Sequence, residues 1–196
     1  GDTNPQHLSP QSLLDCAAST SASGPIAPMQ PSKQCMGCFG CDPSRAVDFL
    51  VQANWSLPLE NDYKYYGTDG TCGPEAFGKR RHIQPYEVQP FNESAMESAV
   101  VEHGAVIVVI DVPKTLGSYS KGIYDDEKLC DPHRPSHTVT IVGYGVETRP
   151  DGSSKKYWTI KNSWSKGWGE QGYVRIEKGV NLCGVESQKI ITMGVR

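Results

Sequence analysis

The sequence predicts an α+β fold in which a helical half, residues 1–104, precedes a half made of antiparallel strands, residues 105–196. Two observations carry this prediction. Helix-start signals are concentrated before Gly104, and short runs with strand character follow one another after it. Helices first and strands second is the order of an α+β protein with two subdomains.

The first two predicted helices share one start signal. Ser9 is an N-cap residue type and Pro10 suits the first helical position, so a helix is expected from there to about Cys16. Asp42-Pro43 repeats that signal for residues 44–53, where the apolar residues recur at helical spacing.

A third helix is expected over residues 94–103, and Gly104 ends it. Between the first two helices, residues 19–34 are rich in Ser, Pro and Ala and are expected to form a surface insertion. The chain shows no internal repeat.

The second half contains a series of strand-like runs. Val106–Ile110 is continuously apolar, which suits a strand that is buried on both faces. Pro150-Asp-Gly-Ser-Ser154 has the chemistry of a hairpin turn. The last run is expected at an edge of the sheet. The predicted strands are residues 106–110, 138–144, 157–161, 173–177 and 190–195.

Composition argues against several functional classes. The net charge of −3 is spread over mixed acids and bases, so we expect no nucleic-acid partner and no membrane partner. The longest apolar stretch, Ala105 to Ile110, is far shorter than the roughly 20 residues that span a bilayer. The chain begins at Gly1 without a methionine, and we interpret it as mature or excised material.

Seven cysteines and two Asn-x-Ser sequons favour an oxidising route, to the lysosome or out of the cell. The sequons predict glycosylation at Asn54 and Asn92, although so short a pattern also occurs by chance and Asn92 suits a helix N-cap equally well. An odd number of cysteines leaves at least one thiol without a partner in the chain, and the sequence alone does not fix the other pairs.

Two polar residues adjoin predicted strands in the second half. His137 opens the run Ser136-His-Thr-Val-Thr-Ile, and Asn162 lies in Tyr157-Trp-Thr-Ile-Lys-Asn-Ser-Trp164. An imidazole titrates near neutral pH and serves as a base, while an amide oxygen orients the ring without adding a charge. Trp164 is expected to shield that hydrogen bond from water.

A single histidine before a strand is more often a solvated turn residue, but Asn162 and Trp164 make the catalytic interpretation the stronger one for His137. The remaining histidines lack such neighbours and are interpreted as surface residues: His7, His82, His103 and His133.

Taken in order, the motifs resemble those of papain-like cysteine peptidases of the cathepsin type. In the first half, Leu8–Cys16 resembles the family's helix that ends in a disulfide cysteine, and Gly37–Cys41 resembles its Gly-Cys-Asn-Gly-Gly turn. In the second half, Ser136-His137 resembles the His block and Lys161–Trp164 resembles the Asn block. Gly167–Tyr173 resembles the stretch that follows the Asn block, and Cys183-Gly184 resembles the closing cysteine. No cysteine here lies in a Gly-Ser-Cys-Trp-like setting. The resemblance therefore implies a papain-like fold without its N-terminal segment, which carries the nucleophile, its central helix and the glutamine of the oxyanion hole.

The resemblance also implies a disulfide pattern. Cys16 is expected to pair with Cys72 and Cys130 with Cys183, which leaves Cys35 and Cys41 to close a small loop. Cys38 occupies the position whose family partner lies near the catalytic cysteine, so an interchain disulfide is expected there. The alternative, a metal or iron–sulfur site in Cys35-Met-Gly-Cys38-Phe-Gly-Cys41, lacks a fourth ligand at suitable spacing, and we expect no metal and no cofactor.

Substrate contacts follow from the resemblance as well. The family's glycine turn pairs with an extended substrate backbone, at positions held here by Gly40 and Cys41. The cysteine replaces a usual glycine, which puts that pairing in doubt, and Ser165 replaces another glycine after Asn-Ser-Trp. The main specificity pocket is expected to be lined by Asp42, Pro43, Val109, Thr138 and Gln188, although these residues are equally well explained as core or surface positions.

The sequence thus predicts the larger part of a cysteine peptidase in which His137 and Asn162 act with a cysteine from a separate or missing N-terminal segment. The expected partners are a short chain carrying that cysteine, a protein or peptide substrate, and a propeptide or cystatin-like inhibitor. Two alternatives stay open at this point: a papain-fold pseudoenzyme with a binding or structural role, and a peptidase whose N-terminal residues are simply left out of the sequence.

Overall fold

The computed structural model describes residues 7–18, 35–52, 56–73, 83–88, 90–187 and 190–195. The chain divides into two compact units, one of residues 1–84 with 194–196 and one of residues 85–193. The sequence placed the boundary near Gly104, about one helix later. The difference is α3 (Glu93–His103), whose buried Met96, Ala99 and Val100 belong to the core of the second unit.

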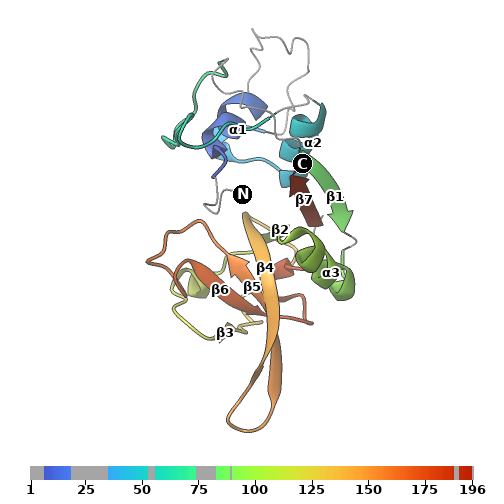
Figure 1. Ribbon diagram of the computed structural model, residues 1–196. Coiled ribbons are helices and arrows are strands. Elements are labelled where there is room, and N and C mark those ends of the chain that lie inside the picture. Colours follow the sequence, from blue (N-terminus) through green and yellow to red (C-terminus); the bar gives the residue numbers. More distant parts are fainter. Residues whose placement is uncertain are drawn as a thin grey trace. The chain divides into compact units, whose positions relative to one another are not determined.

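The first unit is helical. It contains α1 (Pro10–Ala17), the 3-10 turn η1 (Gly37–Phe39) and α2 (Pro43–Gln52) (Figure 1). The hydroxyl of Ser9 accepts a hydrogen bond from the Ser12 N–H at 3.1 Å, so the predicted N-cap is formed. The insertion predicted at residues 19–34 lies outside the described residues.

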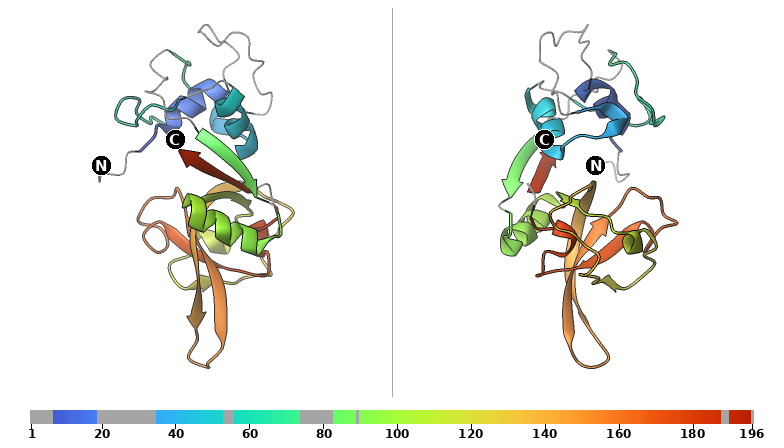
Figure 2. Two further views of the ribbon diagram at one scale, coloured as in Figure 1. Left: turned by 45° about the vertical axis from the view of Figure 1, so that its right-hand side comes forward. Right: turned by 180° about the vertical axis from the view of Figure 1, so that it is seen from behind.

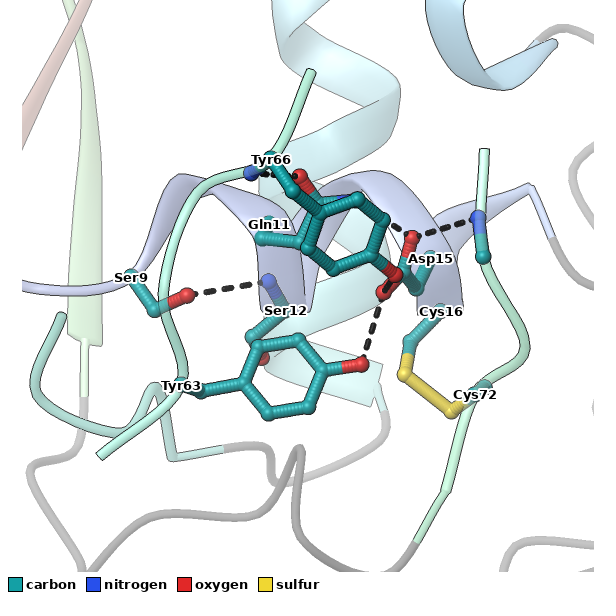
Figure 3. Close-up of a disulfide and its surroundings, with 9 residues drawn as sticks. Ser9, Gln11, Ser12, Asp15, Cys16, Tyr63, Tyr66 and Cys72 are labelled. Atoms are coloured by element: carbon teal, nitrogen blue, oxygen red, sulfur yellow. Dashed lines mark hydrogen bonds between the residues drawn. A yellow bond between two sulfur atoms is a disulfide. The ribbon is translucent and has the colours of Figure 1, made fainter. Parts of the chain in front are cut away.

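The buried face of α1 holds the segment from Tyr63 to Cys72 through hydrogen bonds and a disulfide (Figure 3). Asp15 is only 3% exposed, and its carboxylate accepts four hydrogen bonds of 2.7–2.9 Å. The donors are the hydroxyls of Tyr63 and Tyr66, the Gln11 amide and the Gly70 N–H. Burial, followed by the hydrogen bond to Asp15, raises the pKa of Tyr63.

The strands form one sheet in the order β1-β7-β2-β4-β5-β6-β3. They are β1 (Ile83–Val88), β2 (Val106–Ile110), β3 (Ile123–Tyr124), β4 (His137–Thr148), β5 (Ser154–Lys161), β6 (Tyr173–Glu177) and β7 (Ile190–Val195), with α4 (Lys114–Gly117) and the 3-10 turn η3 (Leu182–Gly184) between them. β2, β4, β5 and β6 pair antiparallel, and β3 pairs parallel with β6.

Two strand predictions were wrong. β7 is not an edge strand, since it lies between β1 and β2. The edge strand is β1, which was not predicted from the sequence. It contains Pro85, a residue type that edge strands tolerate. β2 is not buried on both faces: Val106, Val108 and Ile110 are buried, while the residues between them are half-buried.

α3 lies against the sheet of the second unit (Figure 2), and its buried residues belong to one core cluster with buried residues of the strands. Trp158 and Ile160 of β5 and Ile141 of β4 are fully buried there with Met96. Beyond this core β4 and β5 continue as a two-stranded ribbon around the turn predicted at residues 150–154, and both strands are longer than predicted (Figure 1). No helix among the described residues is long and apolar enough to cross a membrane.

Replacing Asp15 is expected to destabilise the first unit in graded steps. Asp15→Leu leaves the Gly70 N–H and the Gln11 amide without their acceptor and should cost more than about 3 kcal/mol. Asp15→Asn should cost only about 1–2 kcal/mol, because its amide nitrogen can donate to the tyrosine hydroxyls. Urea unfolding followed by circular dichroism, with amide exchange at Gly70, measures both. Equal costs for the two variants would contradict this account.

Candidate active site

The sheet places His137 and Asn162 at the same edge. His137 is the first residue of β4 and pairs with Ile110 of β2, and the preceding N–H, of Ser136, donates to the Ile110 carbonyl at 2.9 Å. Asn162 directly follows β5, and its N–H donates to the Gly172 carbonyl at 2.9 Å. Because β4 and β5 are antiparallel neighbours, the start of one strand adjoins the end of the other.

The two side chains are joined by a hydrogen bond. His137 Nε2 lies 2.9 Å from Asn162 Oδ1, and the same oxygen accepts the Ser163 N–H at 2.7 Å. A backbone N–H can only donate, so the Asn162 atom at this position is the oxygen, and His137 must carry its hydrogen on Nε2. In the neutral imidazole the lone pair then lies on Nδ1, to which no described residue forms a hydrogen bond.

Trp164 covers this pair. Its rings stack on the His137 ring with centroids 5.1 Å apart and an interplanar angle of 27°. Trp168 meets Trp164 edge-on at 4.9 Å, and its indole N–H donates to the Gly117 carbonyl at 3.1 Å. One face of the His137 ring therefore lies against aromatic surface, which limits the access of water to the ring from that face.

Ser165 turns the chain directly after Trp164. Its φ of +72° lies in the left-handed region that favours glycine. The Ser165 hydroxyl accepts the Gly167 N–H at 3.3 Å, a local bond that offsets part of the backbone cost. The departure from glycine noted in the sequence is therefore accommodated in this turn.

The second unit contains no free thiol beside this base. Its two cysteines, Cys130 and Cys183, are joined by a disulfide. The pair of His137 and Asn162 has the chemistry to accept and return a proton at Nδ1, and this unit holds no free cysteine for it to activate. No cluster of three or more metal-ligating side chains occurs among the described residues.

The expected substrate residues fall into two groups. Val109 of β2 and Thr138 of β4 are register partners in the second unit. Gly40, Cys41, Asp42 and Pro43 are consecutive residues of the first unit, and Gln188 lies outside the described residues. The Asp42 carboxylate accepts the N–H and the hydroxyl of Ser44 at 2.8 and 2.7 Å, so it caps the start of α2.

The disulfides are the pairs that the resemblance implies: Cys16–Cys72, Cys35–Cys41 and Cys130–Cys183. Cys38 is free and exposed. Its N–H donates to Asp69 Oδ1 at 2.7 Å, and partial desolvation together with this carboxylate raises the pKa of the thiol. A raised pKa lowers the thiolate fraction, so Cys38 lacks the activation of a catalytic nucleophile.

The Cys35–Cys41 loop borders an apolar cavity of about 170 Å³ in the first unit. Its lining contains hydrocarbon side chains of α1 and α2 and the loop's own cysteines: Leu13, Leu14, Ala17, Cys35, Cys41 and Ala46. Cys38 belongs to the same loop, three residues from each of the paired cysteines.

Comparison with known proteins identifies the family of this chain. The family model for papain family cysteine proteases matches residues 2–193. Cathepsin K of Mus musculus is 34% identical over 181 residues, and fruit bromelain of Ananas comosus is 31% identical over 182 residues. Each alignment covers 91% of this chain but only 48% and 45% of the relative, so the chain spans about half the length of these curated relatives.

Solved structures match over nearly the whole chain. The proform of the ragweed pollen cysteine protease Amb a 11 has a TM-score of 0.77 at 29% identity, covering 98% of this chain and 53% of that one. Bromelain from Ananas comosus in complex with the inhibitor E64 has a TM-score of 0.77 at 28% identity, covering 100% of this chain and 81% of that one.

Fold and sequence together define an α+β protein of the papain-like class, as predicted, and the fold prediction is confirmed. The chain belongs to the papain family of cysteine proteases.

Two features of the site could not be found from the sequence. Asp69 contacts Cys38 although the two residues are 31 positions apart in the sequence, and no local sequence pattern predicts this contact. Trp168 lies within the quoted Gly167–Tyr173 motif, but its packing on Trp164 appears only once the turn is folded.

Alkylation of Cys38 in the free chain is expected to have a pH midpoint above that of an ordinary cysteine, about 8.5, because only the thiolate reacts. Asp69→Asn should lower this midpoint, whereas Asp62→Asn, at an exposed position without a contact to Cys38, should leave it unchanged. Iodoacetamide labelling rates measured by peptide mass spectrometry give the midpoints. A midpoint at or below that of a free cysteine would refute the assignment.

Proposed function

We propose that this chain is the larger part of a cysteine peptidase, to which it contributes the base and the orienting residue. The observation that carries the proposal is the 2.9 Å contact of His137 Nε2 with Asn162 Oδ1 beneath Trp164, which leaves Nδ1 free to accept a proton. The nucleophilic cysteine comes from a separate or preceding N-terminal segment.

The reaction follows from the state of the imidazole. Nδ1 of His137 takes the proton from the cysteine thiol, and the thiolate attacks the carbonyl carbon of a peptide bond. The resulting imidazolium returns this proton to the leaving amine as the acyl-enzyme forms. A water molecule then loses a proton to Nδ1 and attacks the thioester, which releases the acid and regenerates the thiol. Asn162 holds the ring through both steps.

The segment that carries the nucleophile is proposed to bind the first unit. Cys38 is exposed and unpaired, and we assign it to a disulfide with this segment. The apolar cavity beside its loop offers a surface on which the segment can bury hydrophobic side chains. The segment would also supply the glutamine of the oxyanion hole that the family resemblance implies.

The substrate is proposed to be a protein or peptide in extended form. Gly40 and Cys41 would pair with its backbone, and Pro43 of the first unit, Val109 and Thr138 of the second unit, and Gln188 are each proposed to contact its side chains. Two of the predicted residues have other tasks: Asp42 caps α2, and the Cys41 side chain is held in its bond to Cys35. We therefore assign recognition at Cys41 to its backbone.

A pseudoenzyme of the same fold, with a binding or structural role, is the second candidate. Ser165 at a φ of +72° and Cys41 favour it, because the family resemblance gives glycine at both positions. The residue at the nucleophile position separates the two candidates: cysteine supports the peptidase, whereas serine or glycine supports the pseudoenzyme.

The isolated chain is expected to have no peptidase activity and to resist thiol-directed epoxide inhibitors. Co-expression with the cysteine-bearing segment should restore activity. In that complex His137→Ala should lower kcat roughly 10²–10⁴-fold, the usual contribution of a general base. Asn162→Ala should retain part of the activity, because it removes orientation alone.

His133→Ala is the matched control, since His133 is exposed and hydrogen-bonds to Asp131 through its backbone N–H. Peptide-substrate kinetics measure all three variants. Equal activity of His137→Ala and His133→Ala would refute the assigned base.

We further propose a secretory route, to the lysosome or outside the cell, with glycans at Asn54 and Asn92; a propeptide or cystatin-like inhibitor would be met there. Asn54 lies outside the described residues. Asn92 is exposed and caps α3, because its Oδ1 accepts the Ala95 N–H at 3.0 Å. A glycan attaches to the amide nitrogen, so the cap and the modification are compatible.

Protein secreted from a eukaryotic host is therefore expected to lose mass on enzymatic deglycosylation, with Asn92 converted to Asp. Ser94→Ala should abolish the modification at Asn92 while keeping the N-cap, whereas Asn92→Ala should also cost about 1 kcal/mol of stability. Glycopeptide mass spectrometry and thermal unfolding make the two measurements. An unmodified Asn92 in protein that is glycosylated at Asn54 would contradict the proposal.

A further inference from the structure

The Arg175 side chain of β6 makes several polar contacts in the second unit. Its Nε and Nη2 donate to the two carboxylate oxygens of Glu170 at 3.0 and 2.9 Å, a bidentate pair. Its Nη1 donates to Glu147 of β4, and the guanidinium lies 5.2 Å from the centre of the Tyr157 ring. One side chain therefore joins three strands to the segment before β6.

Glu170 lies in the segment between β5 and β6 that also carries Asn162. The Glu170 carboxylate accepts the Gly122 N–H at 2.9 Å, and the backbone N–H of Glu170 donates to the Tyr173 carbonyl at 2.9 Å. Gly172, two residues further on, donates its N–H to the Trp168 carbonyl at 2.7 Å and accepts the Asn162 N–H. The ion pair thus fixes the turn that holds the Asn162 backbone.

A second route runs through aromatic side chains. The Gly122 N–H that donates to Glu170 belongs to the residue whose carbonyl accepts the Tyr119 hydroxyl. The Tyr119 ring lies 5.7 Å from Trp168. Trp168 packs on Trp164, which stacks on His137. Both members of the His137–Asn162 pair are therefore connected to the Arg175–Glu170 ion pair through Glu170, Asn162 by backbone hydrogen bonds and His137 by packed rings.

We propose that Arg175, paired with Glu170, is a positioning residue that holds His137 and Asn162 in their hydrogen-bonded arrangement. Arg175 touches neither side chain, so it acts only through the turn and the tryptophans. Its importance for catalysis rests on the proposed function, but its effect on the His137 ring does not.

The ionisation of the pair fits this role. The hydrogen bond with Arg175 is the largest cause that lowers the pKa of Glu170, and the hydrogen bond with Glu170 is the largest that raises the pKa of Arg175. A carboxyl with a lowered folded pKa contributes stability above its ordinary pKa and loses it as the pH falls through the lowered value. The Arg175–Glu170 ion pair, called the brace below, therefore persists in mildly acidic solution.

Lys155 provides a matched control. Its Nζ forms ion pairs with Asp125 Oδ2 at 2.9 Å and with Glu177 Oε2 at 2.7 Å. These three residues form an ion cluster of similar size to that of Arg175. None of the contacts that the structure describes for Lys155 reaches the 162–172 segment. Removing its charge breaks this half-buried cluster, which shares no described ion pair with Arg175 or Glu170.

The test follows the ring N–H of His137 by nuclear magnetic resonance in the chain as it stands. Arg175→Gln and Glu170→Gln should each speed exchange of the Nε2 proton by roughly 2- to 30-fold, the range of energetic coupling between linked residues. Arg175→Lys should give an intermediate value, because a single ammonium cannot make the bidentate contact. Lys155→Gln should leave the exchange rate unchanged.

A merely structural role predicts a different pattern: a lower Tm for Arg175→Gln with the His137 proton unaffected, and that result overturns the proposal. Should Arg175→Gln fail to fold, Arg175→Lys and Glu170→Gln decide by the same criterion. The double variant Arg175→Gln/Glu170→Gln should be no worse than either single variant, since both break one pair.

In the complex with the cysteine-bearing segment, Arg175→Lys should lower kcat with KM little changed. If the wild-type complex is inactive, the proposed function is refuted. If the exchange rate of the His137 Nε2 proton nevertheless changes in the variants, the positioning role of Arg175 still holds.

Discussion

The candidate active site depends on one hydrogen bond, from His137 Nε2 to Asn162 Oδ1. The bond requires that the first residue of β4 and the residue after β5 lie side by side, which the antiparallel pairing of these strands ensures. It also requires that the amide present its oxygen, which the Ser163 N–H enforces. A local motif and a long-range pairing thus fix together which ring nitrogen is free to act as a base.

Much of the fold was predictable because its signals are local. The cap at Ser9, the stop at Gly104 and the apolar run Val106–Ile110 depend on residues within one turn or strand, and the structure has these elements where the sequence placed them. The position of β7 inside the sheet and the edge strand β1 depend on pairing between distant segments. Periodicity carries no information on such pairing, so those predictions failed or were absent.

The site divides in the same way. His137, Asn162 and Trp164 stand in recognisable blocks, and the structure brings these three together. The contact of Asp69 with Cys38 and the brace of Arg175 and Glu170 on the Asn162 turn depend on tertiary folding. Asp42 shows what the structure adds: the resemblance implies a pocket residue, and the structure shows in addition that its carboxylate caps α2.

The central claim is that a second segment, linked to Cys38, completes a thiol site around His137. The most direct measurement is a non-reducing peptide map of the native protein after reaction with an epoxide inhibitor that alkylates catalytic thiols. The account predicts a label on a cysteine outside the 196 residues, in a peptide that is disulfide-linked to the one containing Cys38. A label on Cys38 itself, or a free Cys38 in an active protein, would contradict it.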